Sequence, residues 1–596
     1  MTDRTTGVAA ALDAAADETR ALRLRNWPAQ VPRTVEYPAG TPAMVEHLRH
    51  WARHRPEAVA IAFYGREVTY AEYDDLSDRF AGLLAQQGVR PGDAVGVYLG
   101  NCPQFAIAML GILKLGAVHV PVNPLLKGRG LQHELDDAGV GVLLAQTDLL
   151  DLVEKVRADT PVRTVIATAL GDLLAGTEPL VDAPPPFDTV PDPRSDWHRV
   201  RSAPPAPARD SDPDALAALN YTGGTTGLPK GCEHTQRHMA YTAATATLAG
   251  GAAVGEPTPV GLNFLPVFWI AGEDFGILKP LLNGQTIVLM TRWEPAVAAA
   301  LIARYGVTDT VATVDNYVEL MDLPGFDGAA FRTVVNPLAV SFVLKLTPEL
   351  RARWRALTGG VLREASYGMT ETHTADTFTL GFQDGDRDLT ADPVFCGLPV
   401  PGTDILVVDP EGAPVPLGET GEIVVRSESI LTAYHRRPDA TAEAIRNGWL
   451  HTGDVGKIDD WGAVHYLART KEMIKVNGMS VFPSEVEALL KDHPAIGSVS
   501  VVPRPDARKG QVPLAFVVSA GPIDVAELTA WARENMAGYK VPDFVVVDAL
   551  PMTATGKVRK DVLFERAAQI AGAASDGSPA VAAENVAAVF HEGESK

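Results

Sequence analysis

A glycine- and threonine-rich segment, YTGGTTGLPKG at residues 221–231, contains the residue types that bind phosphate. Glycines let backbone N–H groups approach anionic oxygens, and threonine hydroxyls can donate to the same oxygens. Lys230 would add a positive charge for terminal phosphates. The common nucleotide-triphosphate loop places Ser or Thr directly after its lysine, whereas a glycine follows Lys230. The segment alone therefore predicts either a phosphate-binding loop of another kind or a solvated turn.

Two later segments, SYGMTET and WLHTGDVG, contain side chains suited to a nucleotide and its metal ion. Tyr367 offers an aromatic face for a flat base. Thr370 can donate to a phosphate oxygen, and Glu371 is a hard oxygen ligand of the kind Mg²⁺ prefers. Asp454 could accept hydrogen bonds from two ribose hydroxyls, although an Asp in TGD by itself indicates only a turn.

The first segment resembles the signature loop of the adenylate-forming superfamily: acyl- and aryl-CoA synthetases, nonribosomal adenylation domains and luciferases. Four more segments resemble motifs of this superfamily in its order, over about residues 40–565. They are SYGMTET (366–372), WLHTGDVG (449–456), LARTKEMIKVNGMSVFPSEVE (467–487) and PMTATGKVRK (551–560). The resemblance favours the branch of AMP-dependent acyl-CoA ligases.

The resemblance implies a role for each matching residue. Lys557, on a glycine loop, would be catalytic and stabilise charge as a carboxylate attacks the α-phosphate. Thr370 and Glu371 would act beside it, with Glu371 as the Mg²⁺ ligand, and Lys471 would be the hinge between two domains. The implied residues for binding ATP and coenzyme A are Thr222, Gly223, Gly224, Thr225, Thr226, Gly227, Lys230, Tyr367, Asp454, Arg469 and Gly478.

The chain departs from the family pattern in the region of the acid pocket. Trp269 occupies the place of a usual histidine and would either wall the pocket or pack in the core. Glu273 and Asp274 follow in an apolar, helix-like run, where we expect them to cap the helix or face solvent, with contact to a substrate amine as the alternative. Asn336 replaces a Gly-Gly-Ala-type turn that would lie against the adenine and acyl groups.

The implied reaction has two halves. An acid attacks ATP to form acyl-AMP and pyrophosphate, and a domain rotation then admits coenzyme A to form a thioester. The acid would be a fatty or aryl acid. One alternative is an ATP-dependent diazotase that adenylates nitrite and diazotises an aryl amine. Another is a protein that only binds AMP-like ligands, against which Lys557 and Glu371 argue.

The pattern of elements predicts an α/β fold. AVGVYLG at 94–100, a helix beginning at Pro103 and the strand AVHVPV predict a βαβ unit with parallel strands. We expect a large N-terminal domain of parallel-type sheets and helices plus a small β-rich subdomain, joined by a hinge to a small mobile α+β C-terminal domain. Proline-rich residues 184–213 indicate an exposed connection. The expected segments are a helical extension (1–36), the adenylation domain (37–470), the catalytic-lysine domain (471–565) and a flexible tail (566–596).

Composition narrows the partners. The 52 basic and 74 acidic residues give a net charge of −22, which argues against nucleic acid and anionic membrane surfaces. Three scattered cysteines suggest a reducing compartment, and no apolar run is long enough to span a bilayer. We therefore expect a cytoplasmic enzyme with a small-molecule acid substrate, ATP, Mg²⁺ and coenzyme A, without stable membrane insertion. Whether it forms a homodimer is left open.

Overall fold

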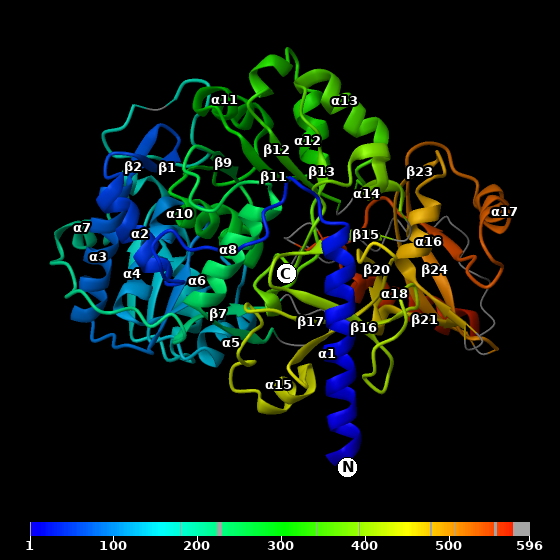
Figure 1. The fold of residues 1–596 in the computed structure, drawn as a ribbon. Coiled ribbons are helices and arrows are strands. Elements are labelled where there is room, and N and C mark those ends of the chain that lie inside the picture. Colours follow the sequence, from blue (N-terminus) through cyan, green and yellow to red (C-terminus); the bar gives the residue numbers. More distant parts are fainter. Residues whose placement is uncertain are drawn as a thin grey trace.

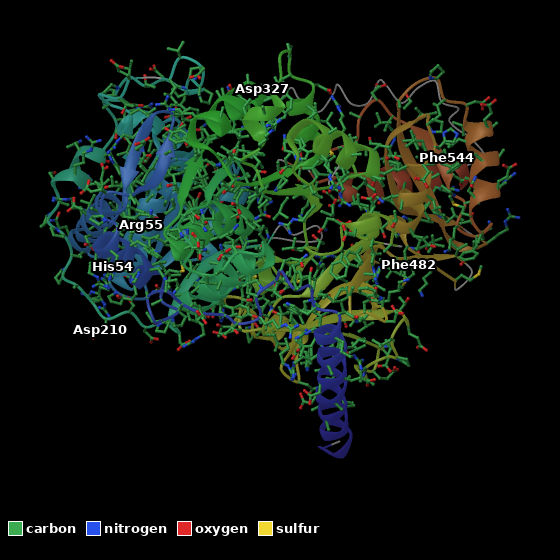
Figure 2. All side chains as sticks on the ribbon, turned by 45° about the horizontal axis from the view of Figure 1, so that its top comes forward. His54, Arg55, Asp210, Asp327, Phe482 and Phe544 are labelled. Atoms are coloured by element: carbon green, nitrogen blue, oxygen red, sulfur yellow. The ribbon has the colours of Figure 1, made fainter. Side chains whose placement is uncertain are left out.

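The fold was obtained as a computed structural model, and it describes residues 2–178, 180–222, 229–341, 344–391, 394–476, 479–506, 508–553 and 557–575. Figure 1 shows a large body of layered sheets and helices, with a smaller C-terminal unit at one side. Figure 2 gives the same arrangement with side chains: His54 and Arg55 lie on the large body and Phe544 on the C-terminal unit. The predicted α/β architecture is confirmed.

Two mostly parallel sheets form the large body. In the first, the strand order is β13-β12-β11-β9-β10-β1-β2, and only β1 and β2 are antiparallel. Its strands are β1 (Val59–Phe63), β2 (Arg66–Thr69), β9 (Val260–Asn263), β10 (Thr286–Leu289), β11 (Asp309–Thr313), β12 (Asn336–Val340) and β13 (Arg363–Glu364).

In the second sheet the order is β6-β5-β3-β4-β7-β8, and only β7 and β8 are antiparallel. Its strands are β3 (Ala94–Tyr98), β4 (Val118–Pro121), β5 (Val142–Gln146), β6 (Thr164–Thr168), β7 (Leu216–Tyr221) and β8 (Gly231–Thr235). Strands β3 and β4 are parallel neighbours joined by α4, which confirms the predicted βαβ unit. Because α4 is buried on every side, its sequence is apolar all round rather than amphipathic.

Helices cover both sheets. They are α2 (Met44–His54), α3 (Tyr70–Gln86), α4 (Pro103–Leu115), α5 (Arg129–Asp137), α6 (Leu150–Arg157), α7 (Trp197–Ser202), α8 (Gln236–Ala249), α9 (Ile270–Glu273), α10 (Lys279–Asn283), α11 (Pro295–Tyr305), α12 (Val314–Met321), α13 (Pro348–Thr358) and α14 (Arg387–Thr390). Helix α7 corrects the expectation of an exposed connection at 184–213, because Trp197 and Val200 are buried in the core. Most residues around it are polar and exposed, which hid this short helix in the composition.

An antiparallel subdomain follows, as the β-rich composition predicts. Its strands are β14 (Thr377–Phe378), β15 (Val394–Pro399), β16 (Asp404–Val408), β17 (Gly421–Arg426), β18 (Ile445–Arg446), β19 (Trp449–Ile458) and β20 (Val464–Arg469), with α15 (Pro438–Ala444) before β18. The N-terminal helix α1 (Thr2–Arg25) lies along this subdomain and its first turns project from the body (Figure 1). Leu12 and Ala16 of α1 are buried against residues of β16, β17 and β19.

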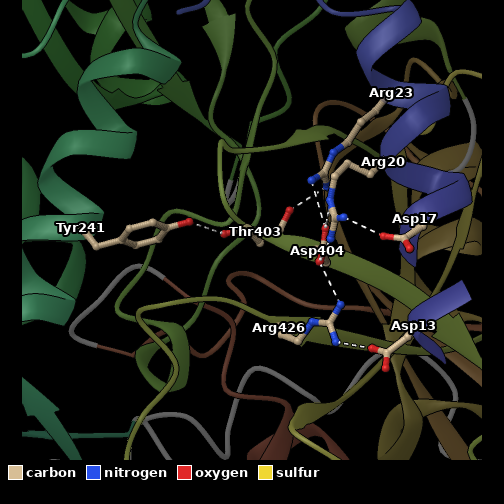
Figure 3. Close-up of polar contacts among 8 residues, drawn as sticks. All are labelled: Asp13, Asp17, Arg20, Arg23, Tyr241, Thr403, Asp404 and Arg426. Atoms are coloured by element: carbon tan, nitrogen blue, oxygen red, sulfur yellow. Dashed lines mark hydrogen bonds and ion pairs between the residues drawn. The ribbon is translucent and has the colours of Figure 1, made fainter. Parts of the chain in front are cut away.

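Three arginines converge on one carboxylate where α1 meets this subdomain (Figure 3). Asp404, at the start of β16, receives Arg20 at 2.5 Å, Arg23 at 3.1 Å and Arg426 at 3.2 Å. Arg23 also donates to the Thr403 carbonyl at 2.6 Å. The expected N-terminal extension is therefore a helix, and it is docked through charge as well as apolar contact.

The C-terminal unit is a small α+β domain. Its elements are β21 (Ile474–Val476), β22 (Met479–Val481), α16 (Pro483–Leu490), β23 (Ile496–Asp506), β24 (Gly510–Ser519), α17 (Val525–Asn535), β25 (Asp543–Val546) and α18 (Lys560–Ser575). Helix α18 continues past residue 565, where we expected the tail to begin. It does so because Ala567 is buried in the core of this domain. None of the described helices combines the length and apolar character needed to cross a bilayer.

Candidate active site

The predicted ribose-binding carboxylate, that of Asp454, lies on a strand. Asp454 of β19 is directly opposite Arg469 of β20, and Arg469 Nε is 2.7 Å from Asp454 Oδ1. The Tyr367 hydroxyl donates to Asp454 Oδ2 at 2.6 Å. Burial raises the pKa of Asp454, and Arg469 and Tyr367 partly offset that effect. Three residues named from three sequence motifs therefore meet at one point, although Asp454 belongs to a strand and not to the turn we predicted.

The SYGMTET segment folds back on itself tightly. A Cβ at Gly368 would lie 1.1 Å from the Thr374 carbonyl oxygen, so only glycine fits there. A short 3-10 turn at Thr370–Thr372 follows, and His373 and Thr374 then have positive φ angles of 56° and 93°. Non-glycine residues seldom adopt this conformation, and such strain is concentrated at functional sites. The turn places Thr370 and Glu371 a few residues after Tyr367, which donates to Asp454.

The predicted phosphate-binding segment, residues 221–231, is closed at its base by hydrogen bonds between Thr222 and Lys230. Thr222 N–H donates to the Lys230 carbonyl at 3.0 Å, and Lys230 N–H donates to Thr222 Oγ1 at 3.2 Å. These residues continue the β7–β8 hairpin, which pairs Tyr221 with Gly231. The residues of the loop itself lie outside the described part of the chain, including the predicted Gly223, Gly224, Thr225, Thr226 and Gly227.

Tyr434 connects the phosphate segment to the predicted metal ligand. Its hydroxyl donates to Glu371 Oε1 at 2.8 Å, and Lys230 Nζ lies 3.8 Å from its ring centroid. Leu431 N–H also donates to the Glu371 carbonyl at 2.7 Å. Sequence reasoning missed Tyr434 because it stands alone in LTAYHRRP, without a second chemical group at a telling spacing. Tyr434 therefore contacts both Lys230 and Glu371.

Lys557 comes to this site from the C-terminal domain. Its backbone N–H donates to Thr553 Oγ1 at 3.0 Å. The residue is exposed overall, yet crowding by neighbouring atoms lowers the pKa of its ammonium, and nearby Arg469 lowers it further while Asp454 opposes the change. Because charges of the large domain act on Lys557, the structure brings the predicted catalytic lysine to the Asp454–Arg469 pair.

The predicted hinge lies between β20 and β21. Lys471 belongs to a 3-10 turn at Thr470–Glu472, and the predicted Gly478 lies outside the described residues. Just beyond the catalytic loop, Lys560 Nζ is 2.7 Å from Glu472 Oε2. Burial alone would lower the pKa of Lys560, but Glu487 and Glu472 outweigh it and raise that pKa. The predicted hinge turn and the start of α18 are thus held together by an ion pair.

Two predictions for the acid pocket were wrong. Glu273 and Asp274 do not face solvent, because both are 0% exposed, and although they stand at helix ends neither side chain makes a capping hydrogen bond. Asn336 begins β12, where it donates to Asp309 at 2.7 Å and receives Arg363. It therefore lies at the amino end of a parallel strand, whereas ligands bind at the carboxyl ends. The sequence had suggested a turn at Asn336, because Asn-Pro favours a turn locally.

Ser341 and Glu364 lie at the opposite end of strands β12 and β13 from Asn336. They follow β12 and end β13, at the carboxyl edge of the sheet. Ser341 Oγ donates to Glu364 Oε2 at 2.7 Å, and its N–H donates to Oε1 at 3.1 Å. Burial raises the pKa of Glu364 to about 7. Trp269, the remaining pocket prediction, is the half-buried N-cap of α9.

This geometry belongs to enzymes that activate an acid as its adenylate, with a nucleotide site in a large domain and a lysine supplied by a small one. The model of the AMP-binding enzyme family matches residues 48–435, and that of the AMP-binding enzyme C-terminal domain matches 485–557. The chain therefore belongs to the AMP-binding enzyme family. Within the adenylate-forming superfamily it falls in the acyl-CoA synthetase branch, the AMP-forming acid–thiol ligases.

Similar proteins cover nearly the whole chain. A long-chain-fatty-acid–CoA ligase of Escherichia coli O6:H1 is 30% identical over 91% of this chain and 98% of its own. A feruloyl-CoA synthase of Amycolatopsis is 32% identical over 85% and 96%. Among solved structures, the anthranilate CoA ligase AuaEII with anthranoyl-AMP has a TM-score of 0.74 at 27% identity, covering 89% of this chain and 98% of that one. ATP-bound MatB of Rhodopseudomonas palustris has 0.76 at 26%, covering 89% and 99%.

Proposed function

We propose that the protein activates a carboxylic acid with ATP, releases pyrophosphate, and transfers the acyl group from AMP to coenzyme A. The observation that carries this proposal is the approach of Lys557, from the C-terminal domain, to Asp454 and Arg469 of the large domain. The relatives whose names mention fatty acids, ferulate and anthranilate support an acid substrate and a thioester product.

Each group has a physical role in this reaction. Thr222 and Lys230 hold the loop that binds the β- and γ-phosphates, Asp454 accepts from the ribose hydroxyls, and Tyr367 provides a face for adenine. The ammonium of Lys557 stabilises the negative charge that develops as the acid attacks the α-phosphate. Positioning and charge stabilisation suffice for this chemistry, and no covalent enzyme intermediate is needed.

Mg²⁺ fits the donor set at Glu371. The described residues contain no group of three or more His, Cys, Asp or Glu that could hold a metal. Mg²⁺ does not need one, because it commonly binds through one or two carboxylates, water and substrate phosphates. The second oxygen of Glu371 and the hydroxyl of Thr370 would hold the ion, which when bound neutralises phosphate charge. Tyr434 orients the carboxylate through its other oxygen.

The test is pyrophosphate release with ATP and Mg²⁺, measured against fatty acids, aryl acids, and nitrite with an aryl amine, each with and without coenzyme A. We expect release with one class of carboxylic acid and steady turnover only when coenzyme A is present. Turnover confined to nitrite and the amine, and indifferent to coenzyme A, would instead assign the protein as a diazotase. Failure of every substrate to release pyrophosphate would overturn the proposal.

A further inference from the structure

A cluster of buried polar side chains lies next to the acid-pocket segment. Glu273 at the end of α9 and His119 of β4 are each 0% exposed, and Asn220 of β7 is 3% exposed. Asn220 Nδ2 donates to Glu273 Oε2 at 3.4 Å, and His119 Nε2 lies 3.7 Å from the same oxygen. The cluster thus joins three elements that are far apart in the sequence.

The hydrogen-bonding capacity of this cluster is largely unused. Among the described residues, Glu273 Oε1, Asn220 Oδ1 and both ring nitrogens of His119 have no hydrogen-bond partner. Leaving a buried polar group unpaired costs about 1–3 kcal/mol. An uncharged imidazole offers one donor and one acceptor, so acceptors outnumber donors here by three to one. A ligand that satisfies the cluster must therefore bring N–H or O–H donors.

The backbone fixes Glu273 in this position. Glu273 N–H donates to the Trp269 carbonyl at 2.8 Å, which holds Glu273 one helical turn after Trp269. A Cβ at Gly272 would lie 2.0 Å from the Pro266 carbonyl oxygen, which shows how closely the turn packs on the preceding chain. A π-helix at Asp274–Leu278 follows directly, a feature frequent at functional sites.

The cluster also lies close to the proposed reaction centre. Asn220 is two residues before Thr222, at the base of the phosphate segment, and His119 pairs with Ala218 on the same strand. Trp269, the N-cap of α9, is half-buried. An aromatic ring against Trp269 could therefore place a polar substituent at Glu273, while a saturated alkyl chain would leave the carboxyl unpaired in an apolar setting.

We propose that Glu273, His119 and Asn220 form a recognition subsite for an amino group on the substrate acid, with Trp269 contacting its aromatic ring. The proposal rests on the proposed function and narrows the acid to an amino-substituted aryl acid. The two N–H groups of the aryl amine donate to Glu273 Oε1 and Asn220 Oδ1, which are two of the three unused acceptors of the cluster.

Matched acids that differ only in one substituent test the subsite. Pyrophosphate release is compared for amino- and methyl-substituted benzoates and cinnamates with the full chain. We expect kcat/KM for the best amino-substituted aryl acid to exceed that for its methyl-substituted counterpart by about 10²-fold or more. The reason is that a site built to accept from a hydrogen-bond donor rejects a ligand that has none. Equal values for every pair would overturn the proposal while leaving acid activation intact.

Variants assign the preference to the cluster. Glu273→Gln is expected to reduce the amino-to-methyl ratio about tenfold or more, and Glu273→Leu to abolish or reverse it. Glu273→Leu should unfold at the same temperature as the wild type or higher, because it removes a buried carboxyl that has one oxygen without a partner. Glu134→Gln, at a buried glutamate of α5 outside the cluster, is the matched control and should keep the wild-type ratio. An unchanged ratio in both Glu273 variants would contradict the assignment.

Calorimetric binding of the same acid pairs without ATP separates the two proposals. It reports on the subsite even if no acid releases pyrophosphate. We expect the amino-substituted aryl acid to bind the wild type at least about tenfold more tightly than the methyl-substituted one. This difference in affinity should vanish in Glu273→Leu. Equal binding in the wild type would show that the cluster holds only water.

Discussion

Lys557 of the C-terminal domain interacts with Asp454 and Arg469 of the large domain. We expect its positive charge to be essential for pyrophosphate release. Lys557→Ala is expected to reduce the rate of pyrophosphate release about 10²–10³-fold, the usual effect of removing one group that stabilises transition-state charge. Lys509→Ala, at an exposed lysine of the same domain, should have no effect and serves as the control. Release at the wild-type rate by Lys557→Ala would refute the catalytic role.

The pH dependence of the same step follows from the lowered pKa of Lys557. The protonated ammonium is the active form, so the rate should fall as pH rises through a value below the ordinary lysine pKa of about 10.4. Lys557→Arg keeps its charge to higher pH and should shift this alkaline limb upward, even if its maximum rate is lower. A limb at the same pH in both proteins would assign the titration to another group.

At the residue scale, sequence reasoning succeeded where several chemical groups share a short motif. Tyr367, Asp454, Arg469 and Lys557 belong to such motifs, and the structure brings them together. It missed Tyr434, because its partners Lys230 and Glu371 are about 200 and 63 residues away along the chain. It placed Glu273 at the surface, because a carboxylate in an apolar run is normally expected to reach water.

At the scale of elements, the attachment of helix α1 to the antiparallel subdomain depends on one buried carboxylate, that of Asp404. Asp404 receives Arg20, Arg23 and Arg426, so Asp404→Asn would leave a buried guanidinium, that of Arg23, poorly paired. Breaking such a pair costs about 3–5 kcal/mol. We expect a lower denaturation midpoint and faster proteolysis of α1, measured by urea unfolding and limited trypsin digestion.

Asp17→Asn is the control for this prediction. Among the described residues Asp17 forms an ion pair only with Arg20, and its side chain is 76% exposed. Removal of an exposed partner of this kind should change the free energy of unfolding by less than about 1 kcal/mol. If the two variants unfolded at the same urea concentration, the Asp404 cluster would not be what holds α1 on β16 and β17.

Element types followed well from periodicity, and element ends less well. The βαβ unit at 94–122 was predictable because buried strands and a proline-initiated helix carry strong local signals. The continuation of α18 to Ser575 was not, because its Ala-rich sequence resembles a solvated tail until Ala567 is seen inside the domain core. The start of β12 at Asn336 was hidden in the same way, since Asn-Pro favours a turn locally.

The whole molecule should lose stability in mild acid through a buried histidine cluster. His234 Nε2 lies 2.8 Å from the Thr370 carbonyl and its Nδ1 lies 3.3 Å from His238 Nδ1, while the His373 ring is 4.7 Å away. Burial lowers the pKa of His238 to about 4 and that of His373 to about 3. The unfolded chain then binds more protons below about pH 6.5, so stability falls as the pH falls.

His238 and His373 should each lower the free energy of unfolding by up to about 3 kcal/mol as the pH falls through this window, at 1.36 kcal/mol per pKa unit. The measurement is the urea midpoint between pH 7 and pH 4. His238→Asn should flatten the acid side of the curve, whereas His198→Gln, at an exposed histidine of α7, should not. Parallel curves for the wild type and His238→Asn would exclude this cluster as the source of acid sensitivity.

The contact between α1 and β16 also sets an order of events during synthesis. Arg20 and Asp404 are 384 residues apart, so the helix leaves the ribosome about 20 to 80 s before its anchor, at ~5–20 residues per second. Most of the stability of a helix in a protein comes from its packing against the rest of the fold. Helix α1 is therefore made well before the strand that anchors it, and it waits without this partner while the intervening sheets are synthesised.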